Sequence, residues 1–325
     1  MKAWEIRDST LALHEVDPPR PQVDAETIRI THAGICGSDL PKLLRPADFA
    51  LPAPWRPGHE IVGIDTGGHP VAVDPLMPCQ LCLRCHAGDT HLCPDLQRIG
   101  WDLPGGFAEQ VSVPTRNLHA LDSGLDPLYA VLADPAAVAI HGLRCNPLTP
   151  GRLAIIGAGT VRLLTAIHAH GTGWTVTVVH RDGHPPDHAF QRGIPVAFTS
   201  MSTIADTTFD AVVDAATGHD AAPLALALRL IRDGGTIIVQ NAYHPDVTLP
   251  APLRHIFRRS INLIGTFSFC RRHRADDFTA ALDLLHTHSR EIGYLVADAG
   301  RLADLPAALS RRPLHPGRRL VLSAR

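Results

Sequence analysis

Four cysteines in one short stretch constrain the fold of this chain more than any other feature. They follow the spacing Cys79-x2-Cys82-x2-Cys85-x7-Cys93, and the whole chain has seven cysteines. Four thiolates in one loop can close a tetrahedral shell around zinc with no open position, which is typical of a structural site. Four unrelated buried or oxidised cysteines are the alternative. An odd total with four crowded together favours metal binding in a reducing compartment over disulfides, so we expect a zinc that folds this lobe.

A second set of metal-binding side chains lies in two motifs of the first half. Residues 34–41 read Gly-Ile-Cys-Gly-Ser-Asp-Leu-Pro, and residues 57–60 read Pro-Gly-His-Glu. Together they offer the thiol of Cys36, the hydroxyl of Ser38, the carboxylates of Asp39 and Glu60 and the imidazole of His59. Thiolate, imidazole and carboxylate are the ligands of an open, catalytic zinc site.

Size and charge limit the classes of partner. A chain of 325 residues is long for one core, which predicts two domains. The net charge of -2 and the pI near 6.8 argue against a nucleic-acid surface and leave a small molecule as the expected ligand. The first residues lack an apolar signal core, and no apolar run approaches ~20 residues, so we expect a cytoplasmic protein without membrane contact.

The pattern of secondary structure changes along the chain. Short β-like runs from Lys2 onward, broken by a proline-rich turn, predict a small antiparallel β domain. After Gly151 strands and helices alternate, which predicts a parallel sheet. The stretch 153–156 reads as a strand and leads into Gly157-Ala158-Gly159-Thr160-Val161-Arg162 and an amphipathic helix.

This strand, turn and helix predict a dinucleotide-binding turn, although its third glycine is replaced. The glycines of Gly-x-Gly-x-x-Gly allow a tight turn and let the backbone approach a pyrophosphate. We expect the cofactor to contact Gly157, Ala158, Gly159, Thr160 and Val161. Arg162 stands where the last glycine is usual, so its side chain either leaves the interface between helix and strand or swings toward the phosphates.

The next strand, 176–179, ends at His180-Arg181-Asp182. An acidic residue at this place binds the ribose hydroxyls of NAD, whereas a cation accommodates the 2′-phosphate of NADP. His180 and Arg181 favour NADP(H) over NAD(H), and Asp182 counts against that preference. The strand 209–215 is followed by Ala216, which we expect to face the cofactor because ligands bind beyond the carboxyl ends of parallel strands.

Taken in order, the motifs resemble those of the zinc-containing medium-chain dehydrogenases/reductases, the alcohol, sorbitol and threonine dehydrogenase family. The resemblance rests on the two motifs with Cys36 and His59, the four-cysteine loop and the Gly-Gly-Phe-Ala-Glu-Gln-Val run at 105–111, and it covers nearly the whole chain. It implies an α/β protein with a GroES-like β domain at 1–146 and 270–325, which includes the zinc lobe 79–93. A Rossmann domain with a doubly wound parallel sheet would span 147–269.

The resemblance also implies roles for single residues. Cys36 and His59 would bind a catalytic zinc, Ser38 would pass on the proton of the substrate hydroxyl, and Asp39 would orient His59. The third ligand is open between Glu60 and Asp134, since aspartate is about 1.5 Å shorter than the glutamate usual at 134. Asp134 would otherwise be a helix N-cap before Pro135. Pro41 replaces a histidine that relays the proton in many members.

The sequence therefore predicts an enzyme with two zincs per chain that transfers a hydride between NAD(P)(H) and a secondary alcohol or ketone. A polyol, sugar or aminocyclitol is the expected substrate, and Trp55 and Trp101 are expected to shape its pocket. The family resemblance favours a homodimer or homotetramer. Two alternatives remain: a reductase of C=C or C=N bonds that does not use the zinc, and a non-catalytic nucleotide-binding protein.

Overall fold

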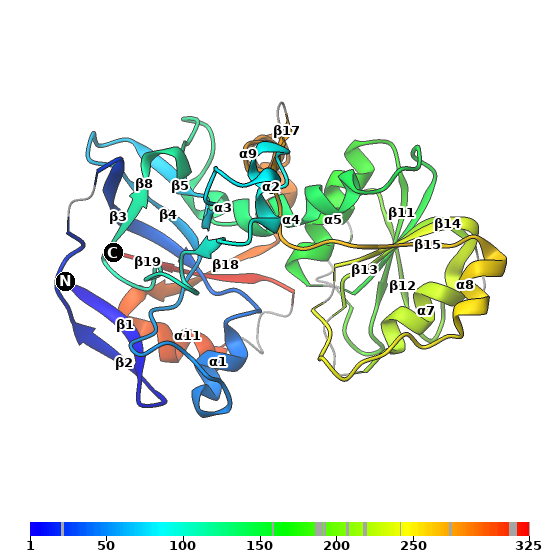
Figure 1. Ribbon diagram of the computed structural model, residues 1–325, viewed down its shortest axis with the longest axis horizontal. Coiled ribbons are helices and arrows are strands. Elements are labelled where there is room, and N and C mark those ends of the chain that lie inside the picture. Colours follow the sequence, from blue (N-terminus) through cyan, green and yellow to red (C-terminus); the bar gives the residue numbers. More distant parts are fainter. Residues whose placement is uncertain are drawn as a thin grey trace. The chain divides into compact units, whose positions relative to one another are not determined.

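The chain divides into two compact units in a computed structural model (Figure 1). Unit 1 comprises Met1–Asp134 and Cys270–Arg325, and unit 2 comprises Pro135–Phe269. The structure describes residues 1–20, 23–157, 159–185, 191, 193–205, 208–216, 220–240, 242–272, 275–311 and 317–324. Among the helices within these ranges, none has the length and apolar character needed to cross a membrane.

Unit 1 is built on a seven-stranded sheet that is mostly antiparallel. Its strands follow the order β18-β19-β3-β4-β5-β9, and β8 also pairs with β3. Their bounds are β3 Ala25–Gly34, β4 Glu60–Ile64, β5 Pro70–Val73, β8 Gln110–Pro114, β9 Leu118–Ala120, β18 Val296–Arg301 and β19 Arg319–Ser323. Only β18 and β19 run parallel to each other. The C-terminal strand thus lies beside the strand that leads to Cys36 (Figure 1).

Shorter elements surround this sheet. A hairpin and two more strand pairs add β1 Lys2–Arg7, β2 Thr10–Glu15, β6 Leu76–Met77, β7 Gln97–Arg98, β16 Arg271–Arg272 and β17 Ala275–Asp276. The helices are α1 Leu40–Leu44, α2 Leu83–His86, α3 Pro127–Ala130, α9 Asp277–Thr287, α10 Ser289–Ile292 and α11 Leu305–Arg311. Single 3-10 turns lie at Pro46–Asp48, Thr90–Leu92, Thr115–Asn117 and Leu302–Asp304. Buried Ile28, Ile30 and Phe107 belong to the core that the sheet covers.

Unit 2 is a six-stranded sheet in which every pairing is parallel, as predicted. The strand order is β12-β11-β10-β13-β14-β15. The bounds are β10 Arg152–Ile156, β11 Thr175–His180, β12 Ala197–Ser200, β13 Phe209–Asp214, β14 Ile231–Val239 and β15 Asn262–Gly265. Helices α5 (Thr160–Gly171) and α7 (Ala222–Leu230) cover opposite faces (Figure 1). Helix α8 spans Leu253–Arg259, and α4 spans Ala133–Arg144.

This strand order reverses direction between β10 and β13, which is the switch point of a Rossmann sheet. The buried apolar runs of β10 and β13 explain the arrangement, because strands covered on both faces need apolar side chains on both. The expected mixed α/β fold class is therefore confirmed.

The chain passes between the two units twice, and the first passage lies earlier in the sequence than the expected boundary after residue 146. The division falls between Asp134 and Pro135, within the first turn of α4, instead of after residue 146. Helix α4 packs on unit 2, where Gln240 Nε2 donates a 2.8 Å hydrogen bond to the carbonyl of Val138. At the second crossing the chain re-enters unit 1 at Cys270.

Candidate functional site

The ends of two paired strands position the candidate metal ligands of unit 1. Strand β3 ends at Gly34 and β4 begins at Glu60, and the antiparallel register places these two residues opposite each other. A Cβ at Gly34 would lie 2.3 Å from Glu60 Oε2, so a glycine is required for the Glu60 carboxylate to occupy this place. Cys36 and His59, just outside the two strands, are thereby brought together.

A contact between two motifs far apart in the sequence fixes the chain at His59. The amide of Gly106 donates to the carbonyl of Gly58 at 2.8 Å, and the amide of Phe107 donates to that of Pro57 at 3.0 Å. A Cβ at Gly105 would lie 2.5 Å from both carbonyl oxygens. Gly105 and Gly106, which belong to the Gly-Gly-Phe-Ala-Glu-Gln-Val run of the sequence, therefore hold the loop that precedes His59.

Three predicted ligands come together in this region. One ligand atom from each of Cys36, His59 and Glu60 lies within 4.8 Å of the others. Asp39 is fully buried, with Oδ2 3.3 Å from His59 Nδ1, which leaves Nε2 of the imidazole for the metal side. The exposed hydroxyl of Ser38 donates to Cys36 Sγ at 3.2 Å.

A buried arginine that the sequence analysis did not single out completes the site. Arg319 Nε lies 3.0 Å from Glu60 Oε2, and Nη1 donates to the carbonyl of Ile35 at 2.9 Å. Both side chains are almost fully buried. Burial raises the pKa of Glu60, although the charges of Arg319 and His59 act in the opposite direction.

Asp134 lies close to the site without joining the three ligands. Helix α4 begins at Ala133, so Asp134 belongs to its first turn, and the alternative interpretation as an N-cap is wrong. Its carboxyl is absent from the group of Cys36, His59 and Glu60, although the charges of His59 and Glu60 act on it. Burial raises the pKa of Asp134 to about 7, against the opposing effect of His59. Of the two candidates, Glu60 is the one whose carboxylate lies within 4.8 Å of a ligand atom of both Cys36 and His59.

The chemistry of this donor set fits a divalent cation. Burial opposes a charge on His59, but Asp39 and Cys36 outweigh it and raise the pKa of His59 well above its usual value. Neither oxygen of Glu60 has a hydrogen-bond partner among the residues that the structure describes. Buried acidic groups with elevated pKa values and unsatisfied oxygens are expected where a metal ion supplies the missing positive charge.

The four cysteines of the loop also lie within ligand distance of one another. Sγ of Cys82 and of Cys85 are 3.5 Å apart, and Sγ of Cys79 and of Cys85 are 4.0 Å apart. Zinc–sulfur bonds of about 2.3 Å in a tetrahedron require sulfurs about 3.8 Å apart, so the loop fits a closed zinc site. Backbone amides of Leu81 and Cys82 donate to Cys79 and lower the pKa of its thiol to about 7.

The predicted cofactor turn lies at the switch point of unit 2. Gly157 has φ +115°, and its amide donates to the carbonyl of Val179 at 2.7 Å. Gly159 is the N-cap of α5, so Thr160 and Val161 form the first turn of the helix. Ala158 lies outside the described residues, whereas Ala216 follows β13 as expected.

Arg162 lies over the glycine turn. Its Nε is 2.7 Å from the place that a Cβ at Gly157 would take, and Nη1 is 2.3 Å from that of Gly159. Its charge also acts on Asp214 at the end of β13. The Arg162 side chain is therefore directed toward the turn that would hold the phosphates, which is the second of the two alternatives predicted for it.

At the end of β11, the cationic side chain of Arg181 is followed by Asp182, which contacts the hydroxyl of Ser202. His180 is the last residue of β11, and Arg181 follows it with an exposed side chain. Asp182 accepts a 2.6 Å hydrogen bond from the hydroxyl of Ser202 beyond β12, and this contact lowers the pKa of Asp182. The acidic residue is thus engaged by the neighbouring turn.

Two tryptophans that we expected at the pocket have different environments. Trp55 is 2% exposed and donates to the carbonyl of Gly100, so it belongs to the core and its predicted pocket role is wrong. Trp101 is partly exposed, and its ring centroid is 6.1 Å from that of His59. Only Trp101 therefore borders the candidate metal site.

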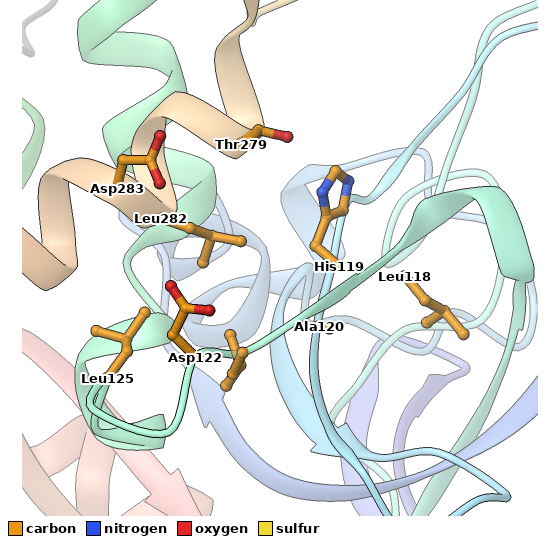
Figure 2. Close-up of a pocket in the computed structure, with 9 residues that line it drawn as sticks. Leu118, His119, Ala120, Asp122, Leu125, Thr279, Leu282 and Asp283 are labelled. Atoms are coloured by element: carbon orange, nitrogen blue, oxygen red, sulfur yellow. The ribbon is translucent and has the colours of Figure 1, made fainter.

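A separate pocket of about 380 Å³ lies between β9 and α9 (Figure 2). Leucines line its wall together with His119, Asp122, Thr279 and Asp283. The His119 ring packs against the Phe278 ring in a tilted arrangement with centroids 4.7 Å apart, and burial lowers the pKa of His119. None of the predicted site residues borders this pocket.

Comparison with known proteins relates the chain to dehydrogenases. The model of the alcohol dehydrogenase GroES-like domain matches residues 24–123. The chain is 30% identical to D-altritol 5-dehydrogenase of Agrobacterium fabrum, with 89% of each chain covered. It is 29% identical to 2-dehydro-3-deoxy-L-galactonate 5-dehydrogenase of Pseudoalteromonas atlantica, with 91% of this chain and 90% of the relative covered.

Solved structures show the same similarity over the whole chain. A zinc-binding dehydrogenase from Sinorhizobium meliloti 1021 bound to NADP has a TM-score of 0.85 and 25% identity, with 99% of this chain and 98% of that one covered. The chain therefore belongs to the medium-chain dehydrogenase/reductase family, and the resemblance seen in its motifs is confirmed.

The Glu60–Arg319 pair makes a testable contribution to stability. Arg319→Met leaves the Glu60 carboxylate buried without its partner, which we expect to lower the free energy of unfolding by about 3 kcal/mol. The double variant Glu60→Gln/Arg319→Met removes both charges and is expected to recover most of this loss. Urea unfolding of the wild type, of the single variants Arg319→Met and Glu60→Gln, and of the double variant measures the coupling. Equal stability of the wild type and Arg319→Met would show that the pair contributes nothing.

Proposed function

We propose that this enzyme is a zinc-dependent oxidoreductase that transfers a hydride between NAD(P)(H) and a secondary alcohol of a polyol or sugar derivative. The observation that carries the proposal is the meeting of Cys36, His59 and Glu60 within ligand distance, with Asp39 behind the imidazole and Ser38 beside the thiol. Family membership supports the oxidoreductase activity over a non-catalytic role.

The chain's own side chains have defined tasks in this reaction. Zinc supplies a Lewis acid that lowers the pKa of a substrate hydroxyl, and the nicotinamide supplies or accepts the hydride. Cys36 and His59 would hold the metal, with Glu60 as the third ligand and Asp134 as its possible replacement. Asp39 fixes the ring of His59 through Nδ1. The exposed hydroxyl of Ser38 is placed to accept the substrate proton.

The cofactor would bind at the edge of the sheet where β10 and β13 end. The turn at Gly157 and Gly159, the first turn of α5 and the Arg162 guanidinium offer amide and cationic donors to a pyrophosphate. His180 and Arg181 support NADP(H), because Asp182 is engaged with Ser202 while Arg181 is exposed.

The relatives support the substrate class. Both named enzymes act at carbon 5 of a sugar acid or an alditol, which is a secondary alcohol within a polyhydroxylated chain. We extend this class to the present enzyme. The spacing of Cys79, Cys82, Cys85 and Cys93 for zinc binding supports a reducing, cytoplasmic location.

Metal content and activity test the proposal together. We expect about two zinc ions per chain in the wild type, one in the proposed catalytic site and one in the four-cysteine loop. Cys36→Ser should lose one zinc and at least ~100-fold in turnover, since removal of a ligand disables metal catalysis. Cys93→Ser should lose the other zinc and lower the Tm. Elemental analysis, thermal unfolding and a screen of polyols and sugar acids with NAD⁺ and NADP⁺ provide the measurements.

Two results would contradict this proposal. Full turnover by folded Cys36→Ser would refute the role of the metal. A wild type that oxidises none of the alcohols and reduces none of their ketones would refute the activity.

Cofactor preference depends on Arg181. Arg181→Ser should weaken NADPH binding by roughly 10-fold or more, because a charged hydrogen bond to the 2′-phosphate is lost, and leave NADH binding unchanged. Fluorescence titration gives both dissociation constants. Arg20→Ser, at an exposed position of unit 1, serves as the control. Tighter binding of NADH than of NADPH by the wild type would contradict the preference.

We further propose a homodimer formed through β15 and α8. Apolar side chains are strongly exposed here: Leu253 by 76%, Phe257 by 82%, Leu263 by 42% and Phe267 by 52%. Strand β15 lies at the edge of the sheet, and no strand among the described residues pairs with its outer side. An open edge beside an apolar patch is suited to pairing with a second copy.

Light scattering tests this assembly. Phe257→Glu should convert the dimer to a monomer, because a charge would be buried in the apolar contact. Val23→Glu, which changes a residue that is 92% exposed on unit 1, should leave the mass unchanged. A monomeric wild type, or a dimer that Phe257→Glu does not alter, would contradict the interface.

A further inference from the structure

Lys42 lies at an unusual place beside the candidate metal site. It is one of two lysines in the chain, and it follows Pro41 in helix α1. Its ammonium donates a 3.1 Å hydrogen bond to the carbonyl of Ser38 and lies 4.0 Å from the centroid of the Trp101 ring. The same ring borders His59 at 6.1 Å between centroids. Lys42 is therefore connected to the site both through Ser38 and through Trp101.

The ammonium is partly removed from water without a matching anion. Burial lowers the pKa of Lys42, although the charges of Asp39 and Cys36 act in the opposite direction. Among the carboxylates that the structure describes, none forms an ion pair with Lys42. Its ammonium contacts a neutral carbonyl and the aromatic faces of Trp101 and Phe49. Such a cation can bind an anion that arrives from solution.

Arg98 is a second cation at the Trp101 ring, and unlike Lys42 it forms an ion pair with a carboxylate. Arg98 Cζ lies 5.1 Å from the Trp101 ring, but its Nε is 2.9 Å from Asp102 Oδ2. The charge of Arg98 is thus already balanced by a neighbour on its own loop. Lys42 is the cation at this ring whose charge no neighbouring carboxylate balances at ion-pair distance, within the described part of the chain.

From this geometry we propose that Lys42 binds an anionic group of the substrate, so that the enzyme prefers anionic polyols to neutral ones. The inference rests on the proposed function, which places a substrate carbinol at Cys36 and His59. The contacts of Trp101 with both residues put the ammonium no more than about 10 Å from the centroid of the His59 ring. An extended six-carbon chain with a hydrogen bond at its far end has a comparable length. An ammonium acts as a point charge and accepts a carboxylate or a phosphate, which are the two sources of the anion.

Three probes with one carbon skeleton distinguish these sources: galactonate, galactitol 1-phosphate and galactitol. Isothermal titration of the zinc-loaded wild type should show tighter binding of at least one anion than of galactitol. Lys42→Met keeps a long side chain against Trp101 and removes the charge. It should weaken binding of the preferred anion by roughly 10- to 100-fold, the value of a charged hydrogen bond, and leave galactitol unaffected. Lys42→Arg should retain most of the affinity.

The matched control is Lys2→Met, which makes the same change at the other lysine, an exposed residue of β1. It should bind all three probes as the wild type does. In turnover experiments Lys42→Met should raise KM for the anion and leave kcat nearly unchanged, whereas a merely structural role would also affect galactitol. The affinity of the wild type for the anion should fall with salt, and this dependence should weaken in Lys42→Met.

The possible outcomes separate the two proposals. Equal affinity of the wild type for the three probes, no binding of either anion, or unchanged binding by Lys42→Met would overturn the role of Lys42. Because titration does not require turnover, anion binding that depends on Lys42 in a protein without dehydrogenase activity would support this inference and refute the proposed function.

Discussion

A buried pair of opposite charges joins the candidate metal site to the sheet of unit 1. Arg319 begins the last strand, and its guanidinium contacts Glu60 at the start of β4 and the carbonyl of Ile35 just beyond β3. A charge buried without its partner is costly, so the two residues hold three strand ends in one arrangement. The position of Cys36 and His59, both in the first fifth of the chain, therefore depends on a residue close to the C-terminus.

The candidate ligands could be proposed from the sequence because their chemistry is local. A thiolate, an imidazole and four closely spaced cysteines are rare combinations, and metal binding requires these residue types. The role of Arg319 could not be predicted in this way, since an arginine before an apolar strand usually ends in solvent. The choice between Glu60 and Asp134 depended on where the first turn of α4 lies, and this is a tertiary property.

The parallel sheet of unit 2 could also be predicted from the sequence, except at two places where there is a physical reason for the difference. Alternation of strands and helices predicts the sheet, but Asp233, Gly234 and Gly235 are residue types typical of a turn. They lie within β14, where the register with β13 shifts between Phe209 and Ala211. A glycine pair in a strand commonly marks such an irregularity. At the cofactor turn, only the structure shows that the long side chain of Arg162 extends over the glycines.

The replacement at Pro41 and the position of Lys42 are connected. Proline has no proton to relay, but its fixed φ suits the first turn of a helix, and α1 begins at Leu40, directly before it. Because the helix begins at Leu40, Lys42 lies within it directly after Pro41. Its ammonium there donates a hydrogen bond to the carbonyl of Ser38, one turn earlier. Where many family members have a histidine, this chain has Pro41, and the neighbouring Lys42 holds a cation beside the candidate metal ligands. Under the proposed function, the exposed Ser38 hydroxyl would pass the substrate proton directly to water, so the change at these two positions would alter substrate preference without removing the acid-base step.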